Sequence, residues 1–264
     1  MQFKKPKNKM EKKYLDELFR EGIVVIPNYF SKSRCNNIIS EINDFSKKDK
    51  LISERDEGIG GDIRIFNFED ESSMGLEFAK NSFLQSLVSK YLGTQLETKS
   101  VLAGKVVFNK SLKTNSGGDW HRDADLSQMK AMIYLTDVSE DNGPFTFIKK
   151  SNDFDFKRQS RKYPFLERLI YIFRGLPTKP PRYSDDYVKN QDEFKKNIIK
   201  VTGKAGTLVI FDGGYIHRGD VIRDGTRYTL TNYYYPIINK TAKFYIKRFL
   251  KNILKLNNPN IKES

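Results

Sequence analysis

Alternating apolar and polar residues dominate the second half of the chain. Runs such as VLAGKVVFN and TRYTLTNYYYP repeat every two residues, which is the period of a β-strand with one buried face. Glycine, asparagine and aspartate residues separate these runs, as they do at turns between strands. The pattern predicts strands at residues 101–109, 130–138, 143–150, 206–213 and 226–236. Because few helical patterns intervene, we expect a mainly β fold, a barrel or sandwich, with flanking helices.

Helical spacing is concentrated nearer the N-terminus. Residues 14–21 and 82–92 carry apolar residues three or four positions apart, and Ser31 is placed to cap the helix that follows it. A strand is predicted at residues 22–30. Residues 151–200 interrupt the later strand pattern with an expected helix and the proline-rich run LPTKPPRY. We interpret this segment as an insertion, or lid, between two core strands.

Length and cysteine content narrow the class of protein. The 264 residues are enough for a substantial core, and we expect a single domain over residues 1–264. The one cysteine, Cys35, excludes an intrachain disulfide and fits a reducing cytoplasm. No run approaches the roughly 20 apolar residues that cross a bilayer. The basic start MQFKKPKNKM lacks the apolar centre of a signal peptide. These features predict a cytoplasmic protein.

The net charge of +14 is carried mostly by the two ends of the chain. Residues 1–13 and 240–264 together hold thirteen basic and two acidic residues, so they account for +11, and the 226 residues between them for about +3. A protein that binds nucleic acid spreads its positive charge over the surface of the fold. A nucleic-acid partner is therefore not expected. We interpret the two ends as a basic N-terminal tail and a basic C-terminal helix.

The C-terminal segment separates its apolar and basic residues with helical periodicity. At 100° per residue, one face carries apolar residues such as Phe249 and Ile253, and the opposite face carries Lys247, Arg248 and Lys251. One hypothesis is a peripheral contact with the anionic inner face of a membrane. The alternative is a helix packed on the core of the domain itself. None of these patterns indicates whether the protein is a monomer or an oligomer.

The chain contains two histidines, and both are placed for one kind of metal site. In GDWHRDAD, His121 and Asp123 lie two residues apart, so on a strand their side chains point to the same face. His217 follows the predicted strand at 206–213 after a Gly-Gly turn. Two imidazoles and one carboxylate on one face of an octahedron leave three positions open, the arrangement of non-haem Fe(II) oxygenases. These three residues are the predicted metal ligands and catalytic centre, and Asp125 is a competing carboxylate.

A keto-acid co-substrate requires a cation for its distal carboxylate. Arg227 lies ten residues after His217 on the next predicted strand, and a planar guanidinium pairs with both oxygens of a carboxylate. Arg227, Thr229 and Thr231 share one face of that strand, so Thr229 is a second candidate for co-substrate binding. Lys105, on an earlier strand, is the alternative anchor and a candidate for substrate contact.

Four passages extend this pattern over roughly residues 17–236: FREGIVVIPNYFSKSRCNNIISEI, DWHRDAD, YLTDVSEDNGPFTFI and GTLVIFDGGYIHRGDVIRDGTRYTLTNYYYP. Together they resemble the phytanoyl-CoA dioxygenase-like family of Fe(II)/2-oxoglutarate-dependent oxygenases. The resemblance implies a double-stranded β-helix (jelly-roll, cupin-like) core that uses Fe(II), 2-oxoglutarate and O₂ and releases succinate and CO₂. In the halogenating relatives a small residue replaces the carboxylate ligand, so Asp123 favours hydroxylation.

The chain departs from this family at two places close to the expected substrate. After the DNGP turn it continues with IKKSN rather than the usual Pro-Gly-Ser-His sequence, and Arg122 stands where a glutamine is common. The family's substrate is therefore not transferred. We expect a small-molecule or a lipid- or glycan-linked substrate. The alternatives are a nucleic-acid or protein oxygenase of the same chemistry and a non-catalytic jelly-roll binding module.

Overall fold

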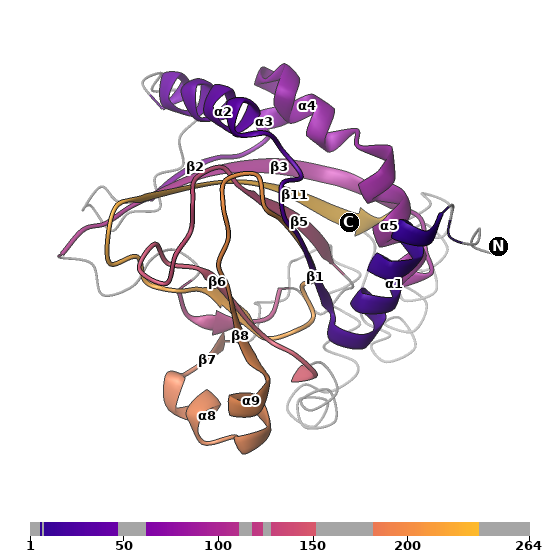
Figure 1. The fold of residues 1–264 in the computed structure, drawn as a ribbon, viewed down its shortest axis with the longest axis vertical. Helices are drawn as coiled ribbons and strands as arrows, with labels where there is room; N and C mark the ends of the chain where they lie inside the picture. Colours follow the sequence, from indigo (N-terminus) through magenta and orange to yellow (C-terminus); the bar gives the residue numbers. More distant parts are fainter. Residues whose placement is uncertain are drawn as a thin grey trace, which may run out of the picture.

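The strands form two antiparallel sheets that face each other (Figure 1). The computed structural model describes residue 6 and residues 8–46, 62–110, 118–123, 128–151 and 182–237. The larger sheet has the order β1 (Ile23–Ile26), β9 (Leu208–Asp212), β5 (Met129–Tyr134), β11 (Thr226–Pro236), β3 (Leu96–Val107) and β2 (Asp62–Ile65). The smaller sheet has the order β7 (Arg182–Tyr183), β4 (Trp120–His121), β10 (His217–Gly219), β6 (Phe145–Ile148) and β8 (Ile198–Val201).

Helices cover the outer face of the larger sheet, and two short helices lie beside the smaller one (Figure 1). The first group is α1 (Lys9–Glu21), α2 (Lys32–Phe45), α3 (Phe68–Glu71), α4 (Ser73–Ala79) and α5 (Ser82–Leu92). The second is α8 (Asp185–Lys189) and α9 (Asp192–Asn197). The predicted mainly β, jelly-roll fold with flanking helices is confirmed.

Local capping explains where the first helices begin. The side chain of Ser31 accepts a hydrogen bond from the backbone N–H of Arg34, as predicted for α2. Asn8 caps α1 in the same way through the N–H of Glu11, at 2.8 Å. The helix therefore begins at Lys9, inside the segment 1–13 that was predicted to be a tail.

Each strand of the larger sheet has one face toward the helices and one toward the smaller sheet. On β9, Leu208 and Ile210 pack with the helices, whereas Val209 and Phe211 point between the sheets. Phe211 lies against Phe145 of β6, with ring centroids 4.4 Å apart. This alternation is the two-residue period seen in the sequence, and it places a largely apolar layer behind the metal centre described below.

The predicted insertion at residues 151–200 contains core structure at its C-terminal end. Residues 182–183 pair with β4, and residues 198–201 pair with β6, so both belong to the smaller sheet. The expected helix of the insertion falls within residues 152–181, which lie outside the described residues, as does the C-terminal segment 240–264. Among the helices that the structure describes, none is both long and apolar enough to cross a bilayer.

Candidate metal centre

The two histidines face each other on neighbouring strands of the smaller sheet. His121 ends β4 and His217 begins β10, and the two residues are register partners in the antiparallel pair. Their ring centroids lie 4.5 Å apart. Asp123 follows two residues after His121, and one ligand atom from each of the three side chains lies within 4.8 Å of the others. The structure thus brings together the three predicted metal ligands.

A glycine allows the carboxylate to approach. The N–H of Asp123 donates to the carbonyl of Gly213 at 2.9 Å, in the turn between β9 and β10. A Cβ atom on Gly213 would lie 2.4 Å from Asp123 Oδ2, far inside van der Waals contact. The Gly-Gly turn noted in the sequence therefore does more than reverse the chain, because it leaves room for the carboxylate beside His217.

Backbone carbonyls fix the tautomer of both imidazoles. His121 Nδ1 lies 2.7 Å from the carbonyl oxygen of Asp119, and His217 Nδ1 lies 2.8 Å from that of Tyr215. A carbonyl only accepts, so each Nδ1 carries the proton and each Nε2 keeps a free lone pair. His217 Nε2 is 3.5 Å from Asp123 Oδ2. Both donor nitrogens are thereby prepared for a metal ion.

Burial keeps the imidazoles neutral. It lowers the pKa of His217 to about 3, although the nearby Asp123 acts in the opposite direction. Burial also lowers the pKa of His121. Near neutral pH no proton competes for either Nε2, which is the protonation state that a metal ligand requires.

Asp123 is ionised, and only one of its two carboxylate oxygens accepts a hydrogen bond from a described residue. Oδ1 accepts a hydrogen bond from the ammonium of Lys130 at 2.7 Å, whereas Oδ2 is buried and has no hydrogen-bond partner among the described residues. Burial alone would raise the pKa of Asp123, but the charge of Lys130 and the contact with His217 bring it below its usual value. The pKa of Lys130 is raised, because Asp123 outweighs the effect of burial. Two neutral imidazoles and one unsatisfied carboxylate oxygen fit a divalent transition metal.

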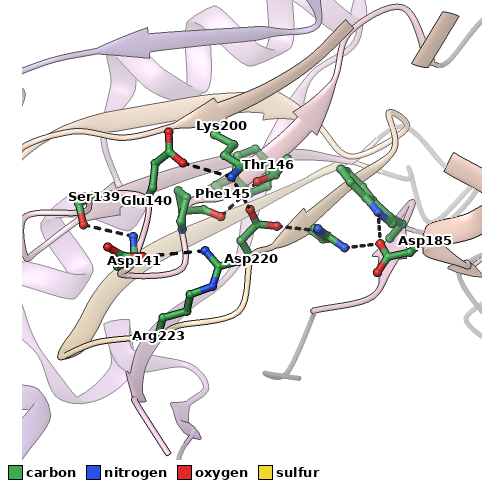
Figure 2. Close-up of polar contacts among 12 residues, drawn as sticks. Ser139, Glu140, Asp141, Phe145, Thr146, Asp185, Lys200, Asp220 and Arg223 are labelled. Atoms are coloured by element: carbon green, nitrogen blue, oxygen red, sulfur yellow. Dashed lines mark hydrogen bonds and ion pairs between the residues drawn. The ribbon is translucent and has the colours of Figure 1, made fainter. Parts of the chain in front are cut away.

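A hydrogen-bond network joins the two ligand strands on the outer face of the smaller sheet. Asp185 of α8 accepts from Trp120 Nε1 at 2.8 Å and from Arg218 Nη1 at 2.6 Å. The Arg218 guanidinium also lies over the Trp120 ring, 4.3 Å from its centroid, and donates to Asp220. Figure 2 shows the network continuing from Asp220 through Lys200. Because Trp120 and Arg218 directly adjoin the two histidines in sequence, these contacts hold β4 and β10 together behind the metal centre.

Arg122, between the two ligand candidates of the first motif, is held by three hydrogen bonds. Its guanidinium donates to the carbonyl of Gly214 at 2.7 Å, to the hydroxyl of Tyr183 at 3.1 Å and to the carbonyl of Ser151. It therefore ties the ligand segment to the turn before His217 and to β7.

Arg227 lies buried between the sheets, close to the strand of His217. Its Nη2 would lie 3.3 Å from a Cβ on Gly219, and its Nη1 would lie 3.1 Å from one on Gly143. Gly219 shares a face of β10 with His217, two residues earlier. Burial lowers the pKa of the guanidinium, partly offset by Tyr134 and by carboxylates farther away. In the part of the chain that the structure describes, Arg227 has neither a hydrogen bond from its side chain nor a carboxylate within ion-pair distance.

The weaker candidates fall in different places. Thr229 lies on the same face of β11 as Arg227, and its hydroxyl would lie 3.0 Å from a Cβ on Gly104. Lys105 points the other way, toward the helices, where its ammonium donates to the Asn43 side chain of α2 at 3.2 Å. It is therefore wrongly placed for substrate or co-substrate. Asp125 lies outside the described residues.

The jelly roll brings two histidines and an aspartate together at the neighbouring strands β4 and β10. This arrangement defines the class, a double-stranded β-helix protein with a candidate site for one metal ion. The chain belongs to the phytanoyl-CoA dioxygenase (PhyH) family, which matches residues 19–223. The three ligand candidates lie inside the matched range, and Arg227 lies just beyond it. A search of curated proteins finds no match to this chain.

Solved structures share the fold at low sequence identity. The epimerase SnoN, solved with Fe³⁺, α-ketoglutarate and nogalamycin RO, has a TM-score of 0.61 and 15% identity over 86% of this chain and 84% of its own. HygX from Streptomyces hygroscopicus, solved with nickel and 2-oxoglutarate, has a TM-score of 0.56 and 16% identity over 86% and 87%. The carbocyclase SnoK from nogalamycin biosynthesis has a TM-score of 0.59 and 14% identity over 84% and 83%.

Proposed function

We propose that the protein is a cytoplasmic, non-haem Fe(II)/2-oxoglutarate-dependent dioxygenase in which His121, Asp123 and His217 hold the iron. The observation that carries the proposal is the convergence of three ligand atoms within 4.8 Å, with both imidazoles in the tautomer that binds metal. Membership of the PhyH family and the metal and 2-oxoglutarate in the SnoN and HygX structures support the same reading.

Arg227 is the proposed anchor for 2-oxoglutarate. A buried guanidinium with no carboxylate partner among the described residues is costly, unless a ligand supplies the carboxylate. The distal carboxylate of 2-oxoglutarate would do so with two parallel N–H···O bonds. Thr229, on the same face of β11, is the second proposed contact. The co-substrate would then extend from the metal centre toward β11.

Bound iron, 2-oxoglutarate and O₂ supply an oxidation of the substrate that is coupled to release of succinate and CO₂. The chain supplies the surroundings. Aromatic residues from both sheets, including Phe145 and Phe211, pack against His217 and would keep water away from the centre. We propose a small-molecule or a lipid- or glycan-linked substrate and hydroxylation as the outcome. Asp123 supports hydroxylation because it leaves no ligand position for a halide.

The first test is assembly of the centre. Anaerobic Fe(II) and then 2-oxoglutarate, added to the wild-type protein, should produce the visible charge-transfer absorption of a keto acid chelated to Fe(II). His121→Ala, His217→Ala and Asp123→Ala should abolish it while the proteins stay folded by circular dichroism. Asp119→Ala is the matched control, because that carboxylate is exposed and pairs with Arg182 at 3.3 Å. Full absorption in any ligand variant would contradict the assignment.

The second test identifies the type of reaction. Succinate formation should rise when a metabolite or membrane-extract panel includes a substrate. Mass spectrometry of the product then separates three outcomes: one added oxygen for hydroxylation, an unchanged mass for epimerisation, and loss of two hydrogens for ring closure. The last two are relevant because SnoN is an epimerase and SnoK a carbocyclase. Either of them would replace hydroxylation in the proposal without changing the metal centre.

The C-terminal segment is proposed to bring the enzyme to an anionic membrane. The support is the separation of apolar from basic residues over 240–256 and the concentration of charge at the chain ends. Each basic residue near an acidic bilayer contributes about 1 kcal/mol, which salt screens. The full chain should sediment with anionic vesicles at low salt, and a chain that ends at Asn239 should not. Equal, salt-insensitive sedimentation of both would contradict this part.

A further inference from the structure

A buried lysine lies directly behind the carboxylate of the metal centre. Lys130 is the second residue of β5, and its neighbours Met129 and Ala131 pack in the core on the helix side of the sheet. Its own side chain therefore points between the two sheets, where most residues are apolar. The side chain is only 10% exposed, and its Nζ lies 2.7 Å from Asp123 Oδ1.

Two aromatic rings lie near this ammonium. The ring centroid of Tyr233, on the neighbouring strand β11, lies 4.8 Å from Nζ, and that of Phe211 on β9 lies 5.8 Å away. Ring faces attract a cation, but they donate no hydrogen bond to it and accept none of comparable strength. Asp123 is thus the principal polar partner that the structure shows for Lys130.

The contact settles which oxygen of Asp123 is available. A carboxylate that turns about its Cβ–Cγ bond can present either oxygen, or both, to a metal ion. Here Oδ1 is engaged by Lys130, and Oδ2 is left 3.5 Å from His217 Nε2 without a hydrogen bond among the described residues. Turning the carboxylate to offer Oδ1 would break a buried, charge-assisted hydrogen bond.

We propose that Lys130 is a positioning residue for the metal centre: it holds Asp123 so that Oδ2 alone faces the metal. This inference rests on the proposed metal site. Single-oxygen coordination leaves three of six positions open, enough for a chelating keto acid and O₂, whereas a two-oxygen carboxylate leaves two. The lysine also offsets the charge of Asp123, so the centre keeps the positive charge of the metal toward the dianionic 2-oxoglutarate.

A second buried ion pair in the same protein provides a matched control. Lys90 of α5 contacts Glu11 of α1, also at 2.7 Å, and the two side chains are 9% and 1% exposed. Distance and burial are close to those of Lys130 and Asp123, but the pair lies in the helix layer. A purely structural role predicts that Lys130→Met and Lys90→Met have similar effects. A positioning role predicts that Lys130→Met alone changes the metal centre.

The test is titration of the metal-free 264-residue chain with Co(II), monitored through the d–d absorption of the bound ion. Lys130→Met should weaken Co(II) binding by about 10- to 100-fold, the range seen when partners of metal ligands are removed. It should also change the positions and intensities of the d–d bands, because a carboxylate that binds through both oxygens takes a position that a water molecule otherwise occupies. Lys90→Met should match the wild-type protein in both measurements. Equal affinity and an equal spectrum for Lys130→Met and Lys90→Met would overturn the proposal.

A double variant keeps the proposal testable if Lys130→Met alone does not fold. Asp123→Ala leaves a buried ammonium without its partner, so adding Lys130→Met should raise the melting temperature of the metal-free protein. In the Asp123→Ala background, Lys130→Met should not weaken Co(II) binding further. A lower melting temperature, or an undiminished loss of affinity, would show that Lys130 does not act through Asp123. If wild-type and Lys90→Met proteins bind no Co(II), the metal centre itself is wrong, which is a distinguishable outcome.

Discussion

Replacing Arg227 by methionine should weaken co-substrate binding without destabilising the free protein. Arg227 is 8% exposed, and its guanidinium lies against Gly143 and Gly219, with no ion pair among the described residues. In the free protein it is a buried cation, and no paired carboxylate among the described residues offsets the free-energy cost of removing its charge from water. This cost opposes folding. In the complex it is the proposed partner of the distal carboxylate. Methionine fills a similar volume and carries no charge.

The magnitudes follow from the burial and from the chemistry of the pair. Loss of a charge-assisted, two-bond contact weakens binding by about 1.5–3 kcal/mol, or about ten- to hundredfold in the Kd for 2-oxoglutarate. The free energy of unfolding of the ligand-free protein should stay the same or rise by about 1 kcal/mol, because a desolvated charge is removed. Metal affinity should not change, since among the described residues no hydrogen bond or ion pair joins Arg227 to the three ligand side chains.

The assay is titration of 2-oxoglutarate into the Fe(II)-loaded protein without O₂, together with urea unfolding of the free protein. Arg223→Met is the matched control. That arginine lies four residues earlier, is 65% exposed, and is 3.9 Å from Asp141, so its removal should change neither measurement. An unchanged Kd for Arg227→Met would refute the anchor. A loss of several kcal/mol in stability would instead mean that the guanidinium is a structural element of the fold.

Three further predictions concern the surroundings of the site. Gly143→Ala should destabilise the protein by about 1–2 kcal/mol or more in urea unfolding, because φ is 66° and the new Cβ would lie 2.5 Å from the carbonyl oxygen of Asp220; wild-type stability would contradict this. Asp185→Ala removes the acceptor shared by the side chains beside both histidines, so Co(II) affinity should fall severalfold with a stability loss below about 1 kcal/mol, since the carboxylate is 56% exposed; unchanged affinity would show that the network does not support the centre. In the metal-free protein His217 should contribute a loss of about 1.4 kcal/mol of stability per pH unit between pH 6.5 and about 3, because the unfolded residue takes up a proton there and the folded residue, with a pKa of about 3, does not; His217→Asn should make the slope of stability against pH shallower, and an identical slope would contradict the assignment.

Several elements were predictable because the interactions that form them are local. The two-residue period marked β11 at residues 226–236, and helical spacing marked α5 at residues 82–92. Ser31 caps α2 through an N–H three residues away. The metal centre was also predictable, because a chain with two histidines offers few ways to complete a site. The spacing of His121 and Asp123 needs only the geometry of an extended chain.

Other features depended on contacts between distant segments. The sequence predicts an insertion at residues 151–200, because strands of two and four residues, such as β7 and β8, are too short to show a period. Their pairing with β4 and β6 comes from packing. Periodicity placed Lys105 on one of two faces, and only the position of α2 decides that this face is the outer one. Arg122 similarly binds backbone carbonyls of residues 151 and 214, far along the chain.

The sequence by itself therefore determined which side chains could bind a metal, and the tertiary structure decided how they are held. Lys130 follows Asp123 by seven residues, a distance at which no local rule predicts a contact. The two meet because β5 lies beside β9 in the larger sheet, while the segment of Asp123 bonds to the turn after β9. The two-residue period of a strand shows which residues share one face of the sheet with a lysine. Whether that face meets water, a helix or a buried carboxylate is set by the elements packed against it, because burial and charge are properties of the assembled fold.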